Sequence, residues 1–158
     1  MDALEAAVAN ILTKKKLTIA VAESCTGGLV SHRLTNVSGS SKYFRTGVIA
    51  YSNESKENIL GASPKTIARY GAVSKKVALE MAEGIRYLAC VDIGLSVTGI
   101  AGPTGGTMKK PVGLVYVALA TARKRLVREF RFKGSRAEIK FQASQAALDL
   151  VRRQCARS

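Results

Sequence analysis

The sequence has few of the residues that build metal centres, disulfide frameworks and histidine-based active sites. Its 158 residues include one histidine, three cysteines, three prolines and no tryptophan. With His32 alone, a site with several histidine ligands is excluded and a Ser/His/Asp triad is disfavoured. Cys25, Cys90 and Cys155 are odd in number and lack C-x-x-C spacing, so neither a zinc site nor a disulfide framework is predicted. Reduced thiols of this kind are typical of a cytosolic protein.

The sequence also lacks a long apolar run and a basic leader. Its longest uncharged segment, residues 93–108, is broken by five glycines and a proline, whereas a membrane-spanning helix needs about 20 mostly apolar residues. The first five residues are acidic where a signal peptide is basic. We therefore expect a cytoplasmic protein without a membrane partner. Since 47% of the residues are hydrophobic, residues 1–158 are long enough for one core and are predicted to form a single domain.

Acidic residues are scarce, and the chain carries 25 Lys and Arg against 11 Asp and Glu, a net charge of +14. Such an excess attracts nucleic acid or anionic metabolites, although it is also found on ordinary solvated surfaces. Residues 123–140 hold eight of the basic side chains. No stretch alternates basic residues with exposed aromatic ones, as single-strand binders do. Nucleic acid is therefore a possible but not a favoured partner.

Apolar periodicity and turn residues predict helices that alternate with strands. Helices are expected at residues 2–16, 29–34, 53–60, after Pro64, from Ser74 to residue 89, and at 135–151. Strands are expected at residues 17–22, 44–51, 92–97, 112–122 and 125–132, the last two as a hairpin. The predicted fold is α/β: a three-layer α/β/α sandwich with a mixed, mostly parallel sheet of about five strands, one of them antiparallel. The helix that begins at Ser74 is expected to bury the stripe Val77, Met81, Ile85 and Leu88.

The stretch Ala22-Glu23-Ser24-Cys25-Thr26-Gly27-Gly28 lies between an expected strand and an expected helix. A serine at such a turn is held near the N–H groups of a helix start, which favour a developing oxyanion, so Ser24 is a candidate nucleophile. The alternative is that Ser24 or Thr26 caps the helix while Gly27 and Gly28 close the turn. Cys25 is a second candidate nucleophile, but a small buried thiol behind the turn is the favoured interpretation.

Because no suitable histidine is available, the base for Ser24 has to be another residue type. Lys56 follows the expected strand at 44–51 and would act as a general base if burial lowers its pKa. The alternative is an ordinary solvated lysine. The Tyr51 phenol could relay a proton, orient the lysine or cap the strand. The residue types alone leave these roles open.

The glycine-rich residues 97–106 leave the carboxyl end of an expected strand, where open α/β sheets bind ligands. Their N–H groups could cradle a phosphate or an amide, and a flexible turn is the alternative. Neither a P-loop nor a G-x-G-x-x-G spacing is present. Arg136 and Lys140 lie one turn apart at the start of the last expected helix, where cations oppose the helix dipole. A bound phosphate would explain their placement, and surface charge without a function is the alternative.

Five ordered motifs resemble the CinA C-terminal domain family, also called PncC. They are residues 22–28, Tyr51-Ser52-Asn53 with Lys56, Gly71-Ala72-Val73-Ser74, Val97-Thr98-Gly99-Ile100-Ala101-Gly102-Pro103 and Gly134-Ser135-Arg136, within a resemblance over about residues 4–151. The resemblance implies a three-layer α/β/α fold. It also implies a nicotinamide mononucleotide (NMN) amidohydrolase, which converts NMN and water to nicotinic acid mononucleotide and ammonia, with no cofactor and no metal. A homodimer or trimer is expected on the same ground.

The Ser/Lys dyad of the family falls on Ser24 and Lys56. The resemblance implies that neutral Lys56 takes the Ser24 proton as Oγ attacks the carboxamide, and that an acyl-enzyme forms and is hydrolysed. N–H groups of the turn at residues 25–28 would stabilise the oxyanion. Tyr51 joins the two dyad residues as the third candidate in the catalytic group.

The resemblance also provides candidates for substrate binding. Arg136 matches a late arginine of the family and is assigned to the substrate phosphate, while Lys140 stands where an arginine is common and keeps the charge without the bidentate geometry. Thr98 matches a position that lines the pocket. The full set of predicted substrate-binding residues is Thr26, Gly27, Gly28, Thr98, Gly99, Gly102, Arg136 and Lys140.

Two features depart from the family pattern. Ser38 stands where a proline is usual. Many relatives carry a separate N-terminal domain related to molybdopterin-binding proteins, which is missing from this sequence, so we expect a stand-alone form. Because the family name refers to competence and DNA damage, the alternative function is a non-catalytic binding protein of the same fold that contacts nucleic acid. The +14 charge favours that alternative, and the intact Ser24/Lys56 pair opposes it.

Overall fold

Five strands pair in the order β2-β1-β3-β4-β5 to form one mixed sheet. The computed structural model describes residues 3–157 and places the strands at β1 (Ile19–Glu23), β2 (Phe44–Ile49), β3 (Ile93–Gly99), β4 (Leu114–Ala120) and β5 (Arg125–Arg131). Strand β1 runs parallel to β2 and β3, whereas β4 is antiparallel to both β3 and β5. Strand β4 is thus the one reversed strand, which confirms the predicted sheet.

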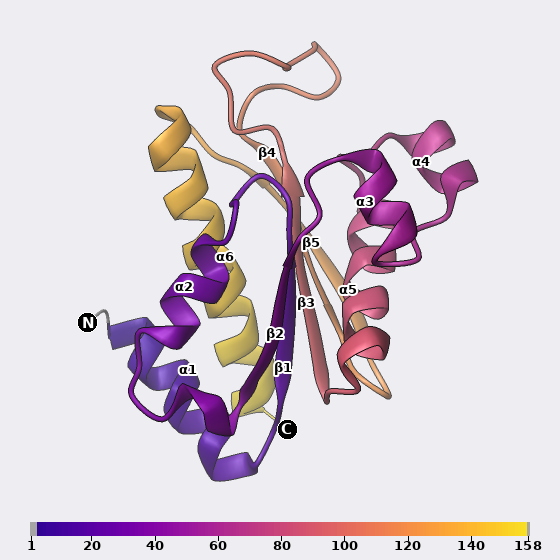
Figure 1. Ribbon diagram of the computed structural model, residues 1–158. Helices are drawn as coiled ribbons and strands as arrows, with labels where there is room; N and C mark the ends of the chain where they lie inside the picture. Colours follow the sequence, from indigo (N-terminus) through magenta and orange to yellow (C-terminus); the bar gives the residue numbers. More distant parts are fainter. Residues whose placement is uncertain (1–2, 158) are drawn as a thin grey trace.

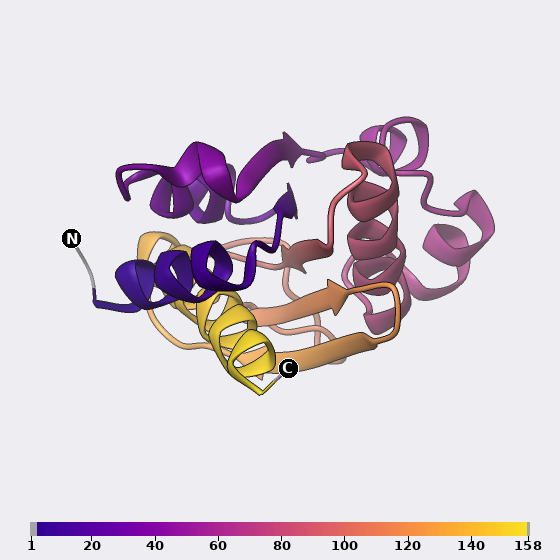
Figure 2. The same ribbon diagram turned by 90° about the horizontal axis from the view of Figure 1, so that it is seen from below.

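Helices cover both faces of this sheet (Figures 1 and 2). One layer consists of α1 (Ala3–Lys15), α2 (Leu29–Thr35) and α6 (Arg136–Ala156). The other consists of α3 (Asn53–Asn58), α4 (Pro64–Tyr70) and α5 (Lys75–Ala89), and a short 3₁₀ turn, η1 (Ser40–Lys42), precedes β2. The architecture is the predicted three-layer α/β/α sandwich. No helix among residues 3–157 is long and apolar enough to cross a membrane.

The alternation of side chains along β1 decides which layer each residue packs against. Ile19 and Val21 join the larger core cluster beneath α1, α2 and α6, while Ala20 and Ala22 face the cluster that contains residues of α5. Successive residues of a strand point to opposite faces, and both faces of this central strand are covered. All five residues of β1 are therefore buried, and Ser24 follows directly at the end of this strand.

Helix starts follow the sequence signals, whereas two details of the prediction are wrong. Ser74 accepts a hydrogen bond from the N–H of Val77 and caps α5, as expected. Leu88 is 52% exposed, because it lies in the last turn at the margin of the buried face. Helix α6 continues to Ala156 instead of ending near residue 151, since no glycine or proline stops it and Cys155 is buried against the core.

Candidate active site

The carboxyl ends of β1, β2 and β3 meet at one edge of the sheet, because the three strands are parallel. Ser24 follows β1 directly, and Thr98 and Gly99 end β3. Helix α3 begins shortly after β2, with Ser52 as its N-cap, and carries Lys56 back toward Ser24. Three separate segments thus bring the predicted catalytic residues to one place.

A cavity of about 200 Å³ lies at this edge. It is lined by Ser24, Cys25, Tyr51, Asn53, Lys56, Ala72, Val73, Thr98, Gly99, Ala101 and Arg136. A larger cavity, of about 420 Å³, lies next to Leu17, Ile93 and Cys155, at the opposite edge of the sheet, and contains none of the predicted site residues. The chemistry-bearing side chains therefore single out the smaller cavity.

The amine of Lys56 is bound by three oxygen atoms. Its Nζ lies 3.1 Å from the Oγ of Ser24 and donates to the carbonyl oxygens of Ala50, at 2.9 Å, and Tyr51, at 3.0 Å. The side chain is only 1% exposed and has no acidic partner among residues 3–157. Burial disfavours the charged ammonium and lowers the pKa of Lys56 from its ordinary value. The solvated-lysine alternative does not describe this side chain.

Of the four N–H groups at residues 25–28, those of Gly27 and Gly28 already have acceptors. The N–H of Ser24 donates to Val97, that of Gly27 to the carbonyl of Ser24, and that of Gly28 to the Glu23 carboxylate. No carbonyl or carboxylate within the described part of the chain accepts from the N–H groups of Cys25 and Thr26. Of the oxyanion donors expected at residues 25–28, the N–H groups of Cys25 and Thr26 therefore remain as candidates.

The two glycines of the turn are required by its backbone. Gly27 and Gly28 have φ angles of +60° and +103°, in the region that favours glycine. A Cβ on Gly28 would also meet the Cδ1 of Ile49 at 3.2 Å. Lys140 reaches the turn from α6, since a Cβ on Gly27 would lie 3.4 Å from its Nζ. The turn thus lies beside one of the two cations that were predicted to bind an anion.

Cys25 and Thr26 are buried next to Ser24, the predicted nucleophile. Burial raises the pKa of Cys25 to about 12, so its thiol stays protonated at neutral pH and is a poor nucleophile. Thr26 is 1% exposed, and its hydroxyl has no hydrogen-bond partner in the described residues. Ser24, whose Oγ contacts the Lys56 amine, is therefore the better-placed candidate nucleophile of the turn.

Arg136 bridges two walls of the cavity. Its Nη1 donates to the carbonyl oxygen of Gly102, at 2.8 Å, and its Nη2 donates to the phenol oxygen of Tyr51, at 3.0 Å. The Tyr51 phenol thus meets Arg136, and it is the backbone carbonyl of Tyr51 that meets Lys56. Gly102 contacts Arg136 without lining the cavity itself.

The end of β3 forms a further wall. The hydroxyl of Thr98 donates to the carbonyl of Ala72, at 2.9 Å, which leaves its lone pairs free to accept. A Cβ on Gly99 would lie 2.6 Å from the Cγ2 of Val115, so this glycine is required by the approach of β4. A role for Gly99 in ligand binding would come from its backbone.

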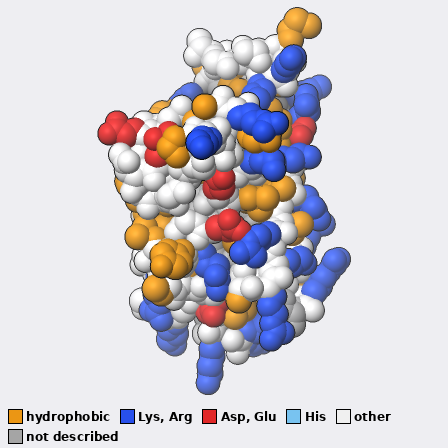
Figure 3. All heavy atoms as spheres, turned by 90° about the vertical axis from the view of Figure 1, so that its right-hand side faces the viewer, with side chains coloured by type: hydrophobic (Ala, Val, Ile, Leu, Met, Phe, Trp, Pro, Cys, Tyr) orange, Lys and Arg blue, Asp and Glu red, His pale blue; other side chains and the backbone are white. Residues whose placement is uncertain are grey.

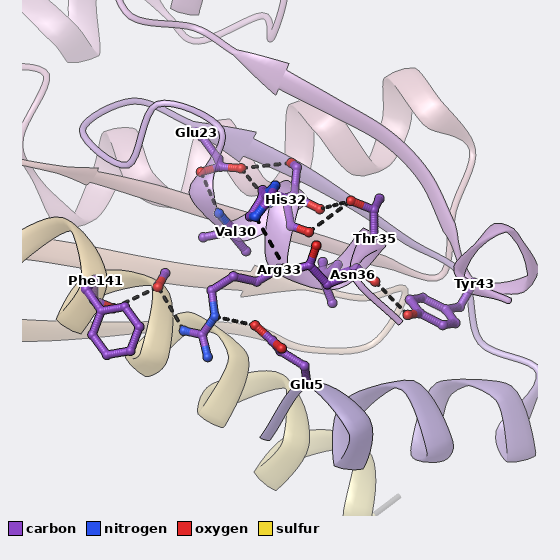
Figure 4. A network of polar contacts seen from close by, with 12 residues as sticks. Glu5, Glu23, Val30, His32, Arg33, Thr35, Asn36, Tyr43 and Phe141 are labelled. Carbon is purple, nitrogen blue, oxygen red and sulfur yellow. Dashed lines mark hydrogen bonds and ion pairs between the residues drawn. The ribbon is translucent and has the colours of Figure 1, made fainter. Parts of the chain in front are cut away.

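Sequence reasoning assigned no individual role to two residues at this site. Glu23 is fully buried, and its carboxylate accepts hydrogen bonds from the start of α2 (Figure 4). Asn53 lines the cavity from the first turn of α3, three residues before Lys56. That spacing, which places both residues on one helix face, was a usable signal. No group of three or more His, Cys, Asp or Glu among residues 3–157 is placed to hold a metal ion.

Comparison of the sequence with known proteins gives long matches. A competence-damage inducible protein of Thermoanaerobacter pseudethanolicus is 56% identical over 152 residues, which are 96% of this chain and 37% of that protein. A CinA-like protein of Kosmotoga olearia is 53% identical, with the same two shares covered. The chain thus spans about 37% of the length of these curated relatives.

Solved structures agree with this result. The CinA superfamily protein of Klebsiella pneumoniae has a TM-score of 0.95 at 32% identity, covering 98% of this chain and 97% of that one. The competence/damage inducible protein CihA of Agrobacterium tumefaciens has a TM-score of 0.91 at 37% identity, covering 96% and 94%. The family model described as the CinA C-terminal domain matches residues 1–155. The chain belongs to the CinA C-terminal domain family.

Proposed function

We propose that this protein hydrolyses the carboxamide of NMN to nicotinic acid mononucleotide and ammonia, with Ser24 as nucleophile and Lys56 as general base. The observation that carries the proposal is the contact between the buried Lys56 amine and the Ser24 hydroxyl, 3.1 Å from Nζ to Oγ. A lysine is a base only when it is neutral, and burial without an acidic partner favours that form.

The remaining contacts of Lys56 can be made by a neutral amine. A neutral amine has two N–H donors and one lone pair, whereas an ammonium has three donors and no acceptor. The carbonyl oxygens of Ala50 and Tyr51 take two donors. The lone pair of a neutral amine then faces the hydroxyl of Ser24 and can accept its proton. The two backbone carbonyls thus orient the base.

The reaction proceeds in two steps, acylation of Ser24 and hydrolysis of the acyl-enzyme. In the first, Oγ of Ser24 attacks the carboxamide carbon while Lys56 takes the hydroxyl proton, and the tetrahedral oxyanion forms near the N–H groups of Cys25 and Thr26. Protonated Lys56 then gives its proton to the departing nitrogen, the C–N bond breaks, and ammonia leaves an ester on Ser24. In the second step, Lys56 deprotonates a water that attacks this ester, and the proton returns to Ser24 as the carboxylate product leaves.

The substrate phosphate is assigned to Arg136 and Lys140. A guanidinium has five N–H donors, and the contacts with Gly102 and Tyr51 use two of them. Lys140 lies beside the turn that contains Gly27. The pyridine carboxamide then enters the cavity of about 200 Å³, where the lone pairs of Thr98 can accept from the carboxamide N–H.

The test is incubation of the purified protein with NMN without added metal, followed by quantification of both products. The proposal predicts ammonia and nicotinic acid mononucleotide in equal amounts. A protein that is folded by circular dichroism but releases neither product would refute it.

The second candidate is a binding protein that contacts nucleic acid. The net charge of +14 supports it, and Figure 3 shows Lys and Arg side chains spread over the face seen there, without forming one continuous stripe. A nucleic-acid binder should retard DNA in a gel with a strong dependence on salt concentration. Retardation by a protein that is inert on NMN would favour this candidate over the hydrolase.

A further inference from the structure

The Glu23 side chain closes the turn that presents Ser24. It is 0% exposed at the end of β1. Its Oε2 accepts from the N–H groups of Gly28, at 3.1 Å, and Val30, at 3.0 Å. Its Oε1 accepts from both the N–H and the hydroxyl of Ser31, each at 2.8 Å (Figure 4). Four donors therefore converge on one carboxylate, with no Lys or Arg side chain paired to it in the described residues.

This arrangement is specific to a carboxylate. A buried charge is tolerated only when hydrogen bonds replace water, and an ionised carboxylate is the side chain that only accepts. The first residues of α2 have no capping side chain of their own at Gly28. Glu23 supplies that cap from the preceding strand, and the positive end of the helix dipole adds to the attraction.

The bonds of Glu23 have a consequence for Ser24. They join residue 23 to residue 28 and so close the loop that contains the nucleophile, while the N–H of Ser24 is fixed to Val97. They also occupy the N–H of Gly28 and leave those of Cys25 and Thr26 without a carbonyl or carboxylate acceptor in the described chain. We infer that Glu23 is a positioning residue, which holds the Ser24 hydroxyl against Lys56 and decides which N–H groups meet the oxyanion.

The inference rests on the proposed function, and it makes a quantitative prediction. Glu23→Gln keeps the shape of the side chain but turns an NH₂ group toward backbone N–H donors, so part of the cap is lost. A displacement of about 1 Å at a reacting group costs on the order of 100-fold in rate. We expect kcat for NMN to fall about 100-fold. The dissociation constant for NMN, measured by calorimetry in a Ser24→Ala background, should change less than about threefold.

A second readout does not depend on the identity of the substrate. A fluorophosphonate probe reacts with activated serines: the Oγ–P bond forms, the P–F bond breaks, fluoride leaves, and the hydroxyl proton passes to the neighbouring base. We expect the rate of labelling at Ser24 to fall with Glu23→Gln by about as much as kcat. The matched control is Glu54→Gln, which removes the same charge from an exposed position and should leave the rate of labelling unchanged.

The outcomes are separable. If labelling and turnover by Glu23→Gln both stay within about threefold of wild type, Glu23 is not a positioning residue. If the wild type is labelled but inert on NMN, the proposed function fails and the labelling comparison still tests Glu23. If Glu23→Gln does not fold, Ser31→Ala takes its place, because it removes one donor to Oε1 and keeps the backbone. In that variant the probe should label Ser24 several-fold more slowly than in the wild type. An unchanged rate of labelling would overturn the inference.

Discussion

Arg136 gives the sharpest test of how the substrate is bound. Its side chain is exposed, two of its five donors are used by Gly102 and Tyr51, and the others can meet a phosphate. A hydrogen bond to a charged group contributes about 1.5–3 kcal/mol. Because solvent screens an exposed group, the contribution of Arg136 lies near the lower end of this range. Arg136→Ala should then raise KM for NMN about tenfold, because 1.4 kcal/mol corresponds to a factor of ten.

The assay compares NMN with nicotinamide riboside, which lacks the phosphate. Arg136→Ala should lower kcat/KM for NMN about tenfold and leave that for the riboside unchanged within about twofold. Arg128→Ala, which removes an exposed arginine from β5, is the matched control and should not change either value. An unchanged KM for NMN in Arg136→Ala, or an equal loss with both substrates, would refute the assignment of the phosphate to Arg136.

Three further predictions concern the base, the buried ion pair and the thiol. Because burial lowers the pKa of Lys56, kcat/KM should rise with pH, and the midpoint of this rise should lie below the ordinary pKa of lysine. The free energy of unfolding should also increase between the lowered pKa and the ordinary one, since the unfolded chain binds more protons there. A pH–rate profile with its midpoint at or above the ordinary pKa would contradict this prediction. The Nε of Arg33 lies 2.7 Å from Oε1 of buried Glu5 (Figure 4), so Arg33→Met should lower the free energy of unfolding by about 3–5 kcal/mol and Tm by roughly 6–20 °C. The double variant Glu5→Leu with Arg33→Met should recover part of this loss. An Arg33→Met variant whose Tm stays within about 2 °C of wild type would exclude a stabilising role for the ion pair. Iodoacetamide at neutral pH should modify exposed Cys90 but not Cys25, whose pKa is raised to about 12. The modified protein should keep its activity. Rapid labelling of Cys25, detected by mass spectrometry, would contradict the assignment of this residue as an unreactive thiol.

The meeting of Ser24 and Lys56 could be predicted because it follows from topology. Each residue lies just beyond an apolar run that ends in a turn, and parallel strands bring their carboxyl ends to one edge. The sheet with a single reversed strand was predictable for a similar reason, since the hairpin of β4 and β5 must reverse one strand. The burial of Lys56 could not be predicted from the polar residues around it in the sequence, because this burial depends on how α3 packs over the site.

Other features depend on the path of the chain in three dimensions. Glu23 looks like the polar end of a strand, and only the fold of the turn brings its carboxylate to three N–H groups of residues 28–31. Gly99, a predicted substrate-binding residue, lines the cavity, and its lack of a side chain also allows the close approach of β4. The Tyr51 phenol was a candidate to orient the lysine, and its backbone carbonyl contacts Lys56 instead. Sequence patterns do not specify these contacts, because each depends on the conformation of a turn or on the packing of a neighbouring strand.

The central claim is that Ser24 and Lys56 act as one catalytic unit. The most direct measurement is ammonia release from NMN by the wild-type protein beside Ser24→Ala and Lys56→Ala, with folding checked by circular dichroism. We predict activity in the wild type and its loss in both variants, because each removes one partner of the 3.1 Å contact. Wild-type activity that persists in either folded variant would contradict the account.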